Sequence, residues 1–230
     1  MRLYVMQLGL SDIGSPVPGY LIQTDDGKNV LVDSGYPESD YRGSTATRPE
    51  SDWVVSRLAE IGLKPSDIDV VVCSHLDVDH AGSHDAFPNA EFVVQREHLA
   101  AAKTMPRFQG IRDHWGGPRL NYREVDGDVE LLPGIELIET SGHVPGHQAI
   151  LVRLPKTGPV LLAVDAIPSD FSGFTPETRP TGTYDNDVEG TRKSTRKLVD
   201  LSEREQVALT IRGHDSKQWP QLTKSPEYYE

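Results

Sequence analysis

The sequence is short of cysteine, of basic residues and of long apolar runs. One cysteine in 230 residues excludes an internal disulfide and a metal site built from cysteines, and Cys73 is expected in the core. The 23 Lys and Arg against 35 Asp and Glu give a net charge of −12, which argues against nucleic acid and anionic membranes as partners. No apolar run approaches the roughly 18 residues of a membrane span, and the N-terminus lacks the apolar stretch of a signal peptide. We therefore expect one soluble cytoplasmic domain over residues 1–230, as a monomer or a homodimer.

The spacing of apolar and turn-forming residues predicts many strands and few helices. Strands are expected near residues 2–9, 18–24, 29–33, 69–73, 91–95, 121–125, 129–132, 135–140, 148–154, 160–164 and 206–211. Helices are expected near 53–61, 96–103 and 187–202, the first with Ser51 as its N-cap and Gly62 at its end, and a polar loop is expected over 34–49. Because the strands come in meandering runs, we expect an α/β (α+β) fold of two mixed, mostly antiparallel sheets with helices on their outer faces.

The most informative segment is His75-Leu76-Asp77-Val78-Asp79-His80, which holds two imidazoles and two carboxylates in six residues. It directly follows the apolar run 69–73, so a buried strand delivers these side chains to one edge of a sheet. Imidazole and carboxylate groups bind zinc, iron, manganese and cobalt. The alternative is a solvated polar turn that is rich in His and Asp.

Three further candidates lie at strand ends elsewhere in the chain: His143, Asp165 and His214. A histidine at one strand end carries little information by itself. Here four expected strands each end in a His or Asp next to small or turn-forming residues, so all of these side chains can meet at one rim of the fold. The sequence therefore predicts a metal centre made from four separate segments.

Several other segments, together with these candidates, form a pattern that is typical of one known protein family. They are Gly19–Asp25, Leu31–Gly35, Val94–Arg96, Leu120–Tyr122, Gly127–Val129, Gly142–Gln148, Gly213–Asp215 and Pro226–Tyr229. With the ordered candidates above, the chain resembles the metallo-β-lactamase superfamily and, within it, the N-acyl homoserine lactone lactonases. The resemblance implies an αββα sandwich that binds two divalent metal ions, with zinc favoured and iron, manganese or cobalt as alternatives.

The resemblance also implies a ligand set of seven residues. The first metal ion would be bound by His75, Asp77 and His143, the second by Asp79, His80 and His214, and both by Asp165. Such an enzyme hydrolyses the lactone ring of a small-molecule N-acyl homoserine lactone with a hydroxide activated by the two metals. Asp79 would orient this nucleophile and pass a proton to the leaving ring oxygen.

The chain departs from the family pattern at two positions. Asp77 stands where the family has a histidine, and an anionic oxygen ligand makes iron, manganese or cobalt more competitive with zinc. The alternative is that Asp77 reaches the first metal ion poorly, so that this ion is weakly bound or absent. Pro168 stands where these lactonases have a tyrosine aimed at the substrate carbonyl, and losing such a donor costs about 2.7–4 kcal/mol of transition-state stabilisation. Two alternatives therefore stay open: another lactone, ester or thioester hydrolase of the glyoxalase II kind, or a binding or sensor protein with impaired catalysis.

Two long loops, 104–120 and 166–186, are expected either to line the substrate site or to be ordinary surface loops. Their candidate lining residues are Phe108, His114, Trp115, Phe171, Phe174 and Tyr184. Of the other histidines, His84 and His98 are expected at the surface, and His147 is expected either to orient a metal-bound group or to be structural, rather than to bind a metal ion itself.

Overall fold

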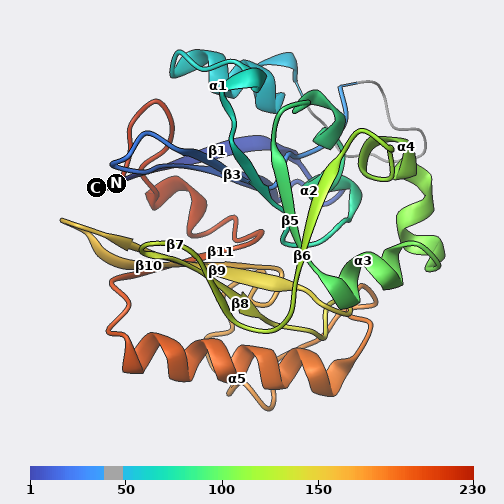
Figure 1. Cartoon of the computed structure of the whole chain (residues 1–230). Coiled ribbons are helices and arrows are strands. Elements are labelled where there is room, and N and C mark those ends of the chain that lie inside the picture. Colours follow the sequence, from blue (N-terminus) through green and yellow to red (C-terminus); the bar gives the residue numbers. More distant parts are fainter. Residues whose placement is uncertain (39–48) are drawn as a thin grey trace.

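The strands of the computed structural model, which describes residues 1–38 and 49–230, form two sheets (Figure 1). In spatial order, the first sheet consists of β1 (Arg2–Leu10), β2 (Pro16–Gln23), β3 (Asn29–Val32), β4 (Val70–Val72), β5 (Glu91–Gln95) and β6 (Asn121–Val125). The second sheet, in the order β11-β10-β9-β8-β7, consists of β7 (Val129–Leu132), β8 (Ile135–Glu139), β9 (Gln148–Leu154), β10 (Gly158–Val164) and β11 (Leu209–Arg212). Most of the expected loop 34–49 lies outside the described residues.

Five α-helices accompany the sheets in the described part of the chain. They are α1 (Val54–Glu60), α2 (Val78–Ala81), α3 (Arg96–Ala102), α4 (Arg112–Trp115) and α5 (Val188–Arg204). Short 3₁₀ turns cover Glu50–Asp52, Pro65–Asp67, His84–Ala86, Pro106–Ile111 and Trp219–Gln221. None of the helices in these described ranges is both long and apolar enough to cross a membrane.

The two sheets differ in strand direction. Antiparallel pairing joins β1 to β2 and β2 to β3, whereas β3, β4, β5 and β6 pair in parallel. The second sheet is antiparallel except for β10 and β11. The prediction of two mixed, mostly antiparallel sheets is therefore confirmed, with five antiparallel and four parallel pairings among the described strands and three of the parallel ones in the first sheet. Parallel neighbours need crossover connections, and helical segments lie between each of these strand pairs along the chain.

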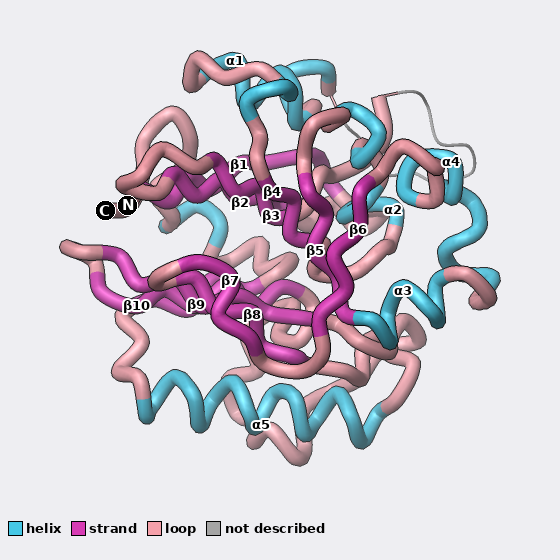
Figure 2. The backbone as a smooth tube through the Cα atoms, in the orientation of Figure 1, coloured by secondary structure: helices cyan, strands magenta, loops and turns pink. Residues whose placement is uncertain are grey.

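The layers follow the order helix, sheet, sheet, helix. Figures 1 and 2 show α1 over the first sheet and α5 along the opposite face of the second sheet. Side chains alternate between layers, as a strand requires: Val70 and Val72 pack between the sheets, while Val71 packs on the outer side with Leu58 of α1. Cys73 also lies in that outer cluster, so its expected place in the core is confirmed.

Helix α5 begins at a capped first turn and packs its apolar face on the second sheet. The Asp187 side chain accepts a hydrogen bond from the Glu189 amide at 3.0 Å and caps the first turn. Leu198 and Leu201 lie three residues apart and pack against Leu161 of β10. The helix predicted for residues 187–202 is confirmed.

The N-cap prediction for the first helix is wrong. Ser51 lies in a separate 3₁₀ turn, and α1 starts only at Val54, where Trp53 precedes it without a side-chain cap. The predicted end is close to the observed one, since Gly62 takes φ +79 and its amide bonds to the Ala59 carbonyl at 3.0 Å.

Packing between the two sheets is expected to supply much of the stability. Ile150 lies in the central strand β9 of the second sheet and is fully buried between the layers. Ile150→Ala should lower the free energy of unfolding by about 2–5 kcal/mol, measured by urea denaturation. Ile13→Ala is the control, because Ile13 is 89% exposed. Equal effects of the two substitutions would contradict the assignment of this layer as the core.

Candidate metal centre

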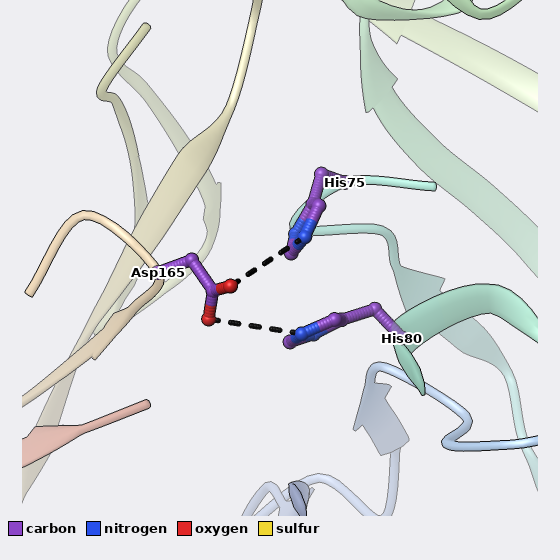
Figure 3. Close-up of side chains that lie close together, drawn as sticks. All are labelled: His75, His80 and Asp165. Atoms are coloured by element: carbon purple, nitrogen blue, oxygen red, sulfur yellow. Dashed lines mark ion pairs between the residues drawn. The ribbon is translucent and has the colours of Figure 1, made fainter. Parts of the chain in front are cut away.

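Seven His and Asp side chains from both sheets meet in one cluster. The segment after β4 of the first sheet supplies His75, Asp77, Asp79 and His80. The segments after β8, β10 and β11 of the second sheet supply His143, Asp165 and His214. Figure 3 shows His75 and His80 facing Asp165 from opposite ribbons. The structure thus brings together all seven side chains that the sequence singled out.

The two oxygens of Asp165 face two different pairs of histidines. Oδ1 lies 3.7 Å from Nε2 of His80 and 3.1 Å from Nε2 of His214. Oδ2 lies 3.9 Å from Nε2 of His75 and 3.3 Å from Nε2 of His143. One carboxylate therefore lies between two sets of imidazole nitrogens, which is the arrangement that a ligand shared by two cations would have.

Three overlapping groups in the described residues have ligand atoms within 4.8 Å of one another. They are His75 with His80 and Asp165, His75 with Asp77 and His143, and Asp79 with His80 and His214. Spacings of this size are those of donor atoms arranged around a common cation.

Local backbone geometry sets the direction of these side chains. Asp77 precedes the one-turn helix α2, whose amides at His80 and Ala81 bond to the Asp77 carbonyl at 3.0 and 2.8 Å. This turn places Asp79 and His80 beside each other. Val164 takes φ 46, a left-handed conformation that β-branched residues rarely adopt, directly before Asp165. Such strain is typical of functional sites.

All four cluster histidines use Nδ1 for a contact outside the cluster and so direct Nε2 inwards. The Nδ1 partners are Ser74 Oγ for His75 at 3.0 Å, Asp33 Oδ2 for His80 at 2.8 Å, Asp185 Oδ1 for His143 at 3.1 Å and Pro16 O for His214 at 2.8 Å. Contacts of this kind fix the tautomer that leaves the Nε2 lone pair free for a metal.

Buried atoms without partners show that these residues suit a cation. Nε2 of His75 and Nε2 of His80 are buried and have no hydrogen-bond partner among the described residues. Burial lowers the pKa of His80, but nearby carboxylates, Asp79 foremost, raise it to about 10. The pKa of His75 is lowered by its burial and then by the charge of His80. Despite burial, nearby carboxylates also raise the pKa of His143, to about 9, and that of His214. The carboxylates therefore favour positive charge in the cluster, which metal ions can provide in place of protons.

The positively charged guanidinium of Arg107 lies at one side of the cluster. Arg107 Nε donates to Oδ1 of Asp77 at 2.6 Å, and its Nη2 donates to Oδ2 of the same carboxylate. Nη2 also lies 2.9 Å from Nε2 of His143, and Nη1 donates to the Tyr184 carbonyl. Burial raises the pKa of Asp77, but the nearby imidazoles of His143 and His75 and the guanidinium of Arg107 bring it well below its usual value.

Three of the residues around this cluster were missed by sequence reasoning: Asp33, Arg107 and Asp185. Asp33 follows strand β3 just as the ligands follow their strands, within a segment that matches the family, so its position was a usable signal. Arg107 and Asp185 lie in long loops, and nothing in their local sequence indicates which ligands they approach.

The prediction that His84 and His98 lie at the surface is wrong, since both are fully buried. His98 donates from Nδ1 to the Pro145 carbonyl at 2.7 Å and accepts the Leu76 amide at Nε2 at 2.8 Å. It thereby joins two of the ligand loops, and burial lowers its pKa to about 4, so it stays neutral. His84 packs against the Phe92 ring at 5.2 Å.

His147 is buried behind the cluster. Its Nδ1 lies 2.8 Å from the Thr140 hydroxyl, and its ring centre lies 5.1 Å from that of His75. His147 belongs to none of the three ligand groups. Its position is that of a side chain that packs against a ligand.

The six aromatic and histidine candidates of the long loops do not form one surface. Phe108 and Trp115 are buried in the core, because the loop 104–120 folds into a 3₁₀ turn and α4, so neither is accessible to a substrate. His114 pairs with Asp85 at 2.8 Å. Phe108 and Trp115 therefore contribute to core packing and not to a substrate site.

The other three candidates lie on the loop 166–186. Phe171 and Phe174 line a cavity of about 390 Å³ beside α5, which none of the seven cluster residues lines. Tyr184 is 72% exposed, and its carbonyl oxygen accepts from Arg107 next to the cluster. Of the six candidates, Tyr184 is thus the one with a described contact to the surroundings of the cluster.

Comparison with known proteins identifies the superfamily to which this fold and this His- and Asp-rich centre belong. A model of the metallo-beta-lactamase superfamily matches residues 13–209. An N-acyl homoserine lactonase of a Bacillus species is 34% identical, over 93% of this chain and 86% of its own. The N-acyl homoserine lactonase AttM of Azorhizobium caulinodans is 33% identical, over 100% of this chain and 99% of its own.

Solved structures that resemble this fold belong to proteins with the same kind of name as these relatives. An N-acyl homoserine lactone hydrolase with the product N-hexanoyl-L-homoserine bound at its catalytic metal center superimposes with a TM-score of 0.88. It is 30% identical, and the match covers 99% of this chain and 98% of that one. The chain belongs to the metallo-beta-lactamase superfamily and, within it, to the family of the N-acyl homoserine lactonases.

The contact between Asp33 and His80 generates a prediction about metal affinity. Asp33→Ala removes the acceptor that orients His80, so affinity for the most tightly bound metal ion should fall about 10–100-fold. Titration against a chromophoric chelator measures this affinity, and circular dichroism checks the fold. Asp26→Ala, in an exposed turn, is the control. Unchanged affinity in Asp33→Ala would show that the contact does not support the metal site.

Proposed function

We propose that this protein hydrolyses the lactone ring of N-acyl homoserine lactones at the His and Asp cluster, with bound divalent metal, zinc foremost. The observation that carries the proposal is the position of Asp165 between two sets of inward-facing Nε2 atoms. It is supported by the family and by the product at the metal center of a neighbour at a TM-score of 0.88.

Four of the cluster residues present a donor set that suits a divalent cation. They are Asp79, His80, Asp165 and His214. A metal ion held there supplies Lewis acidity and lowers the pKa of a bound water towards neutrality. Imidazole nitrogens and carboxylate oxygens together are a combination that zinc accepts well.

Asp79 is the residue placed to move a proton. Its Oδ2 lies 3.6 Å from Nε2 of His80 and 3.7 Å from Nε2 of His214, and its side chain is 19% exposed and so reachable by substrate. In the reaction, water oxygen bonds to the lactone carbonyl carbon and Asp79 accepts the proton. The ring carbon–oxygen bond then breaks, and Asp79 returns the proton to the leaving oxygen, which gives the hydroxy acid.

Pro168 contributes to the site through its backbone, since its ring carries no donor for a substrate carbonyl. Its carbonyl oxygen accepts the backbone amide of His214 at 2.6 Å, and the neighbouring Ile167 carbonyl accepts the Gly213 amide at 3.1 Å. This segment therefore positions the loop that carries His214. A side-chain donor for the substrate carbonyl has to come from elsewhere in the site.

Metal removal tests the proposed activity. Acid release from N-hexanoyl homoserine lactone should be lost when a chelator strips the protein and should return when zinc, manganese, iron or cobalt is added. A parallel assay with a thioester separates the lactonase from the glyoxalase II kind of hydrolase. Activity on the thioester alone, or no hydrolysis with any metal, would overturn the lactonase proposal.

The role of Asp79 predicts a loss of turnover. Asp79→Asn should leave the fold intact and lower kcat/KM for the lactone by about 10²–10⁴-fold, because the proton acceptor is gone. Asp85→Asn is the matched control, a nearby carboxylate that pairs with His114 outside the cluster. Metal content is measured on the same samples, so that loss of metal is not mistaken for loss of the base. Full activity in Asp79→Asn would rule out this role.

A further inference from the structure

The two halves of the cluster differ in the positive charge that they already contain. In the half made by His75, Asp77 and His143, the guanidinium of Arg107 bonds to both oxygens of Asp77 and lies 2.9 Å from Nε2 of His143. The guanidinium thus uses the donor atoms through which these two residues would bind a metal ion.

The other half has no such partner. No arginine or lysine of the described residues forms an ion pair with Asp79, whose contacts are with Nε2 of His80 and of His214. Nε2 of His80 is buried without a hydrogen-bond partner among those residues, as is Nε2 of His75 in the first half, so the two halves differ in the guanidinium and not in these nitrogens. The fit to a metal ion is therefore good in this half, whereas the first half already holds a cation.

The Asp at position 77 explains why an arginine can lie there. A carboxylate takes two parallel hydrogen bonds from a guanidinium, which a neutral imidazole at the same place cannot do. Arg107 is further fixed by the Tyr184 carbonyl, which accepts from its Nη1. The side chain of Asp77 is only 12% exposed, so the ion pair is largely shielded from water and from salt.

We propose that Arg107 takes the place of the first metal ion as a fixed positive charge, so that the centre binds one divalent cation, at Asp79, His80, Asp165 and His214. Asp77 is then the partner of an arginine and not a metal ligand. Asp77 and Arg107 depend on each other, because the arginine binds this carboxylate. Together they distinguish this centre from a two-metal arrangement.

A consequence for catalysis follows if the proposed lactone hydrolysis holds. The described hydrogen bonds use four of the five N–H groups of the guanidinium and leave one on Nη1. Arg107 is 23% exposed, so a substrate can reach it. The remaining N–H is a donor for the carbonyl oxygen of the lactone, where Pro168 offers none.

Metal counting on the purified protein tests the proposal. The protein is stripped, dialysed against excess zinc, freed of loosely bound metal and analysed by mass spectrometry. We expect one zinc per chain in the unchanged protein and two in Arg107→Met, because the ligand atoms of Asp77 and His143 are released. Arg112→Met, an exposed arginine that bonds to Gln109, is the control and should retain one zinc.

Each outcome has one meaning. Two zinc ions in the unchanged protein, or none, would overturn the proposal, and so would a single zinc in folded Arg107→Met. Cobalt provides a second readout: the unchanged protein should give the electron paramagnetic resonance signal of an isolated ion, and Arg107→Met should give spin coupling between two. Because no substrate is present, failure here is distinguishable from failure of the proposed lactone hydrolysis.

Discussion

The shared carboxylate of Asp165 is the constraint on which the site depends. It comes from the second sheet, yet its two oxygens face imidazoles of both sheets within 3.9 Å. Nearby carboxylates and imidazoles that are buried together are unfavourable unless their charges are balanced. A cation bound there would balance them and would at the same time hold the two sheets together at this rim. Folding of the rim and chemistry at the rim are therefore two results of the same electrostatic requirement.

Contacts just outside the cluster turn this requirement into a definite geometry. The carboxylates of Asp33 and Asp185 hold Nδ1 of His80 and His143, so the Nε2 atoms point to the cation positions. Arg107 belongs to the same pattern, because it satisfies the carboxylate of Asp77 as the other residues satisfy imidazoles. Its difference is that it brings positive charge into the cluster, which reduces the need for a second metal ion.

The cluster could be predicted from the sequence because each ligand lies beside a strand end, where local pattern is informative. The segment from His75 to His80 and the later His143, Asp165 and His214 are such positions, and the structure brings them together. The continuous apolar run in residues 69–73 also predicted correctly that this strand is buried. Local pattern sufficed for these strand ends, although it failed for the Ser51 cap of the first helix.

What could not be predicted depends on contacts between distant segments. Arg107 lies thirty residues beyond Asp77, in a loop whose folding into short helical turns also buries Phe108. The burial of His98 results from two backbone groups, of Leu76 and Pro145, that come together only in the folded chain. Parallel pairing in the first sheet is likewise decided by crossover connections and not by residue pattern.

A crystal structure of the zinc-loaded protein, with anomalous diffraction at the zinc absorption edge, would count and locate the metal ions in this centre. We expect one strong anomalous peak next to Asp165 on the side of His80 and His214, with the Arg107 guanidinium against Asp77. A second peak of similar height between His75 and His143, with Arg107 displaced, would contradict this expectation.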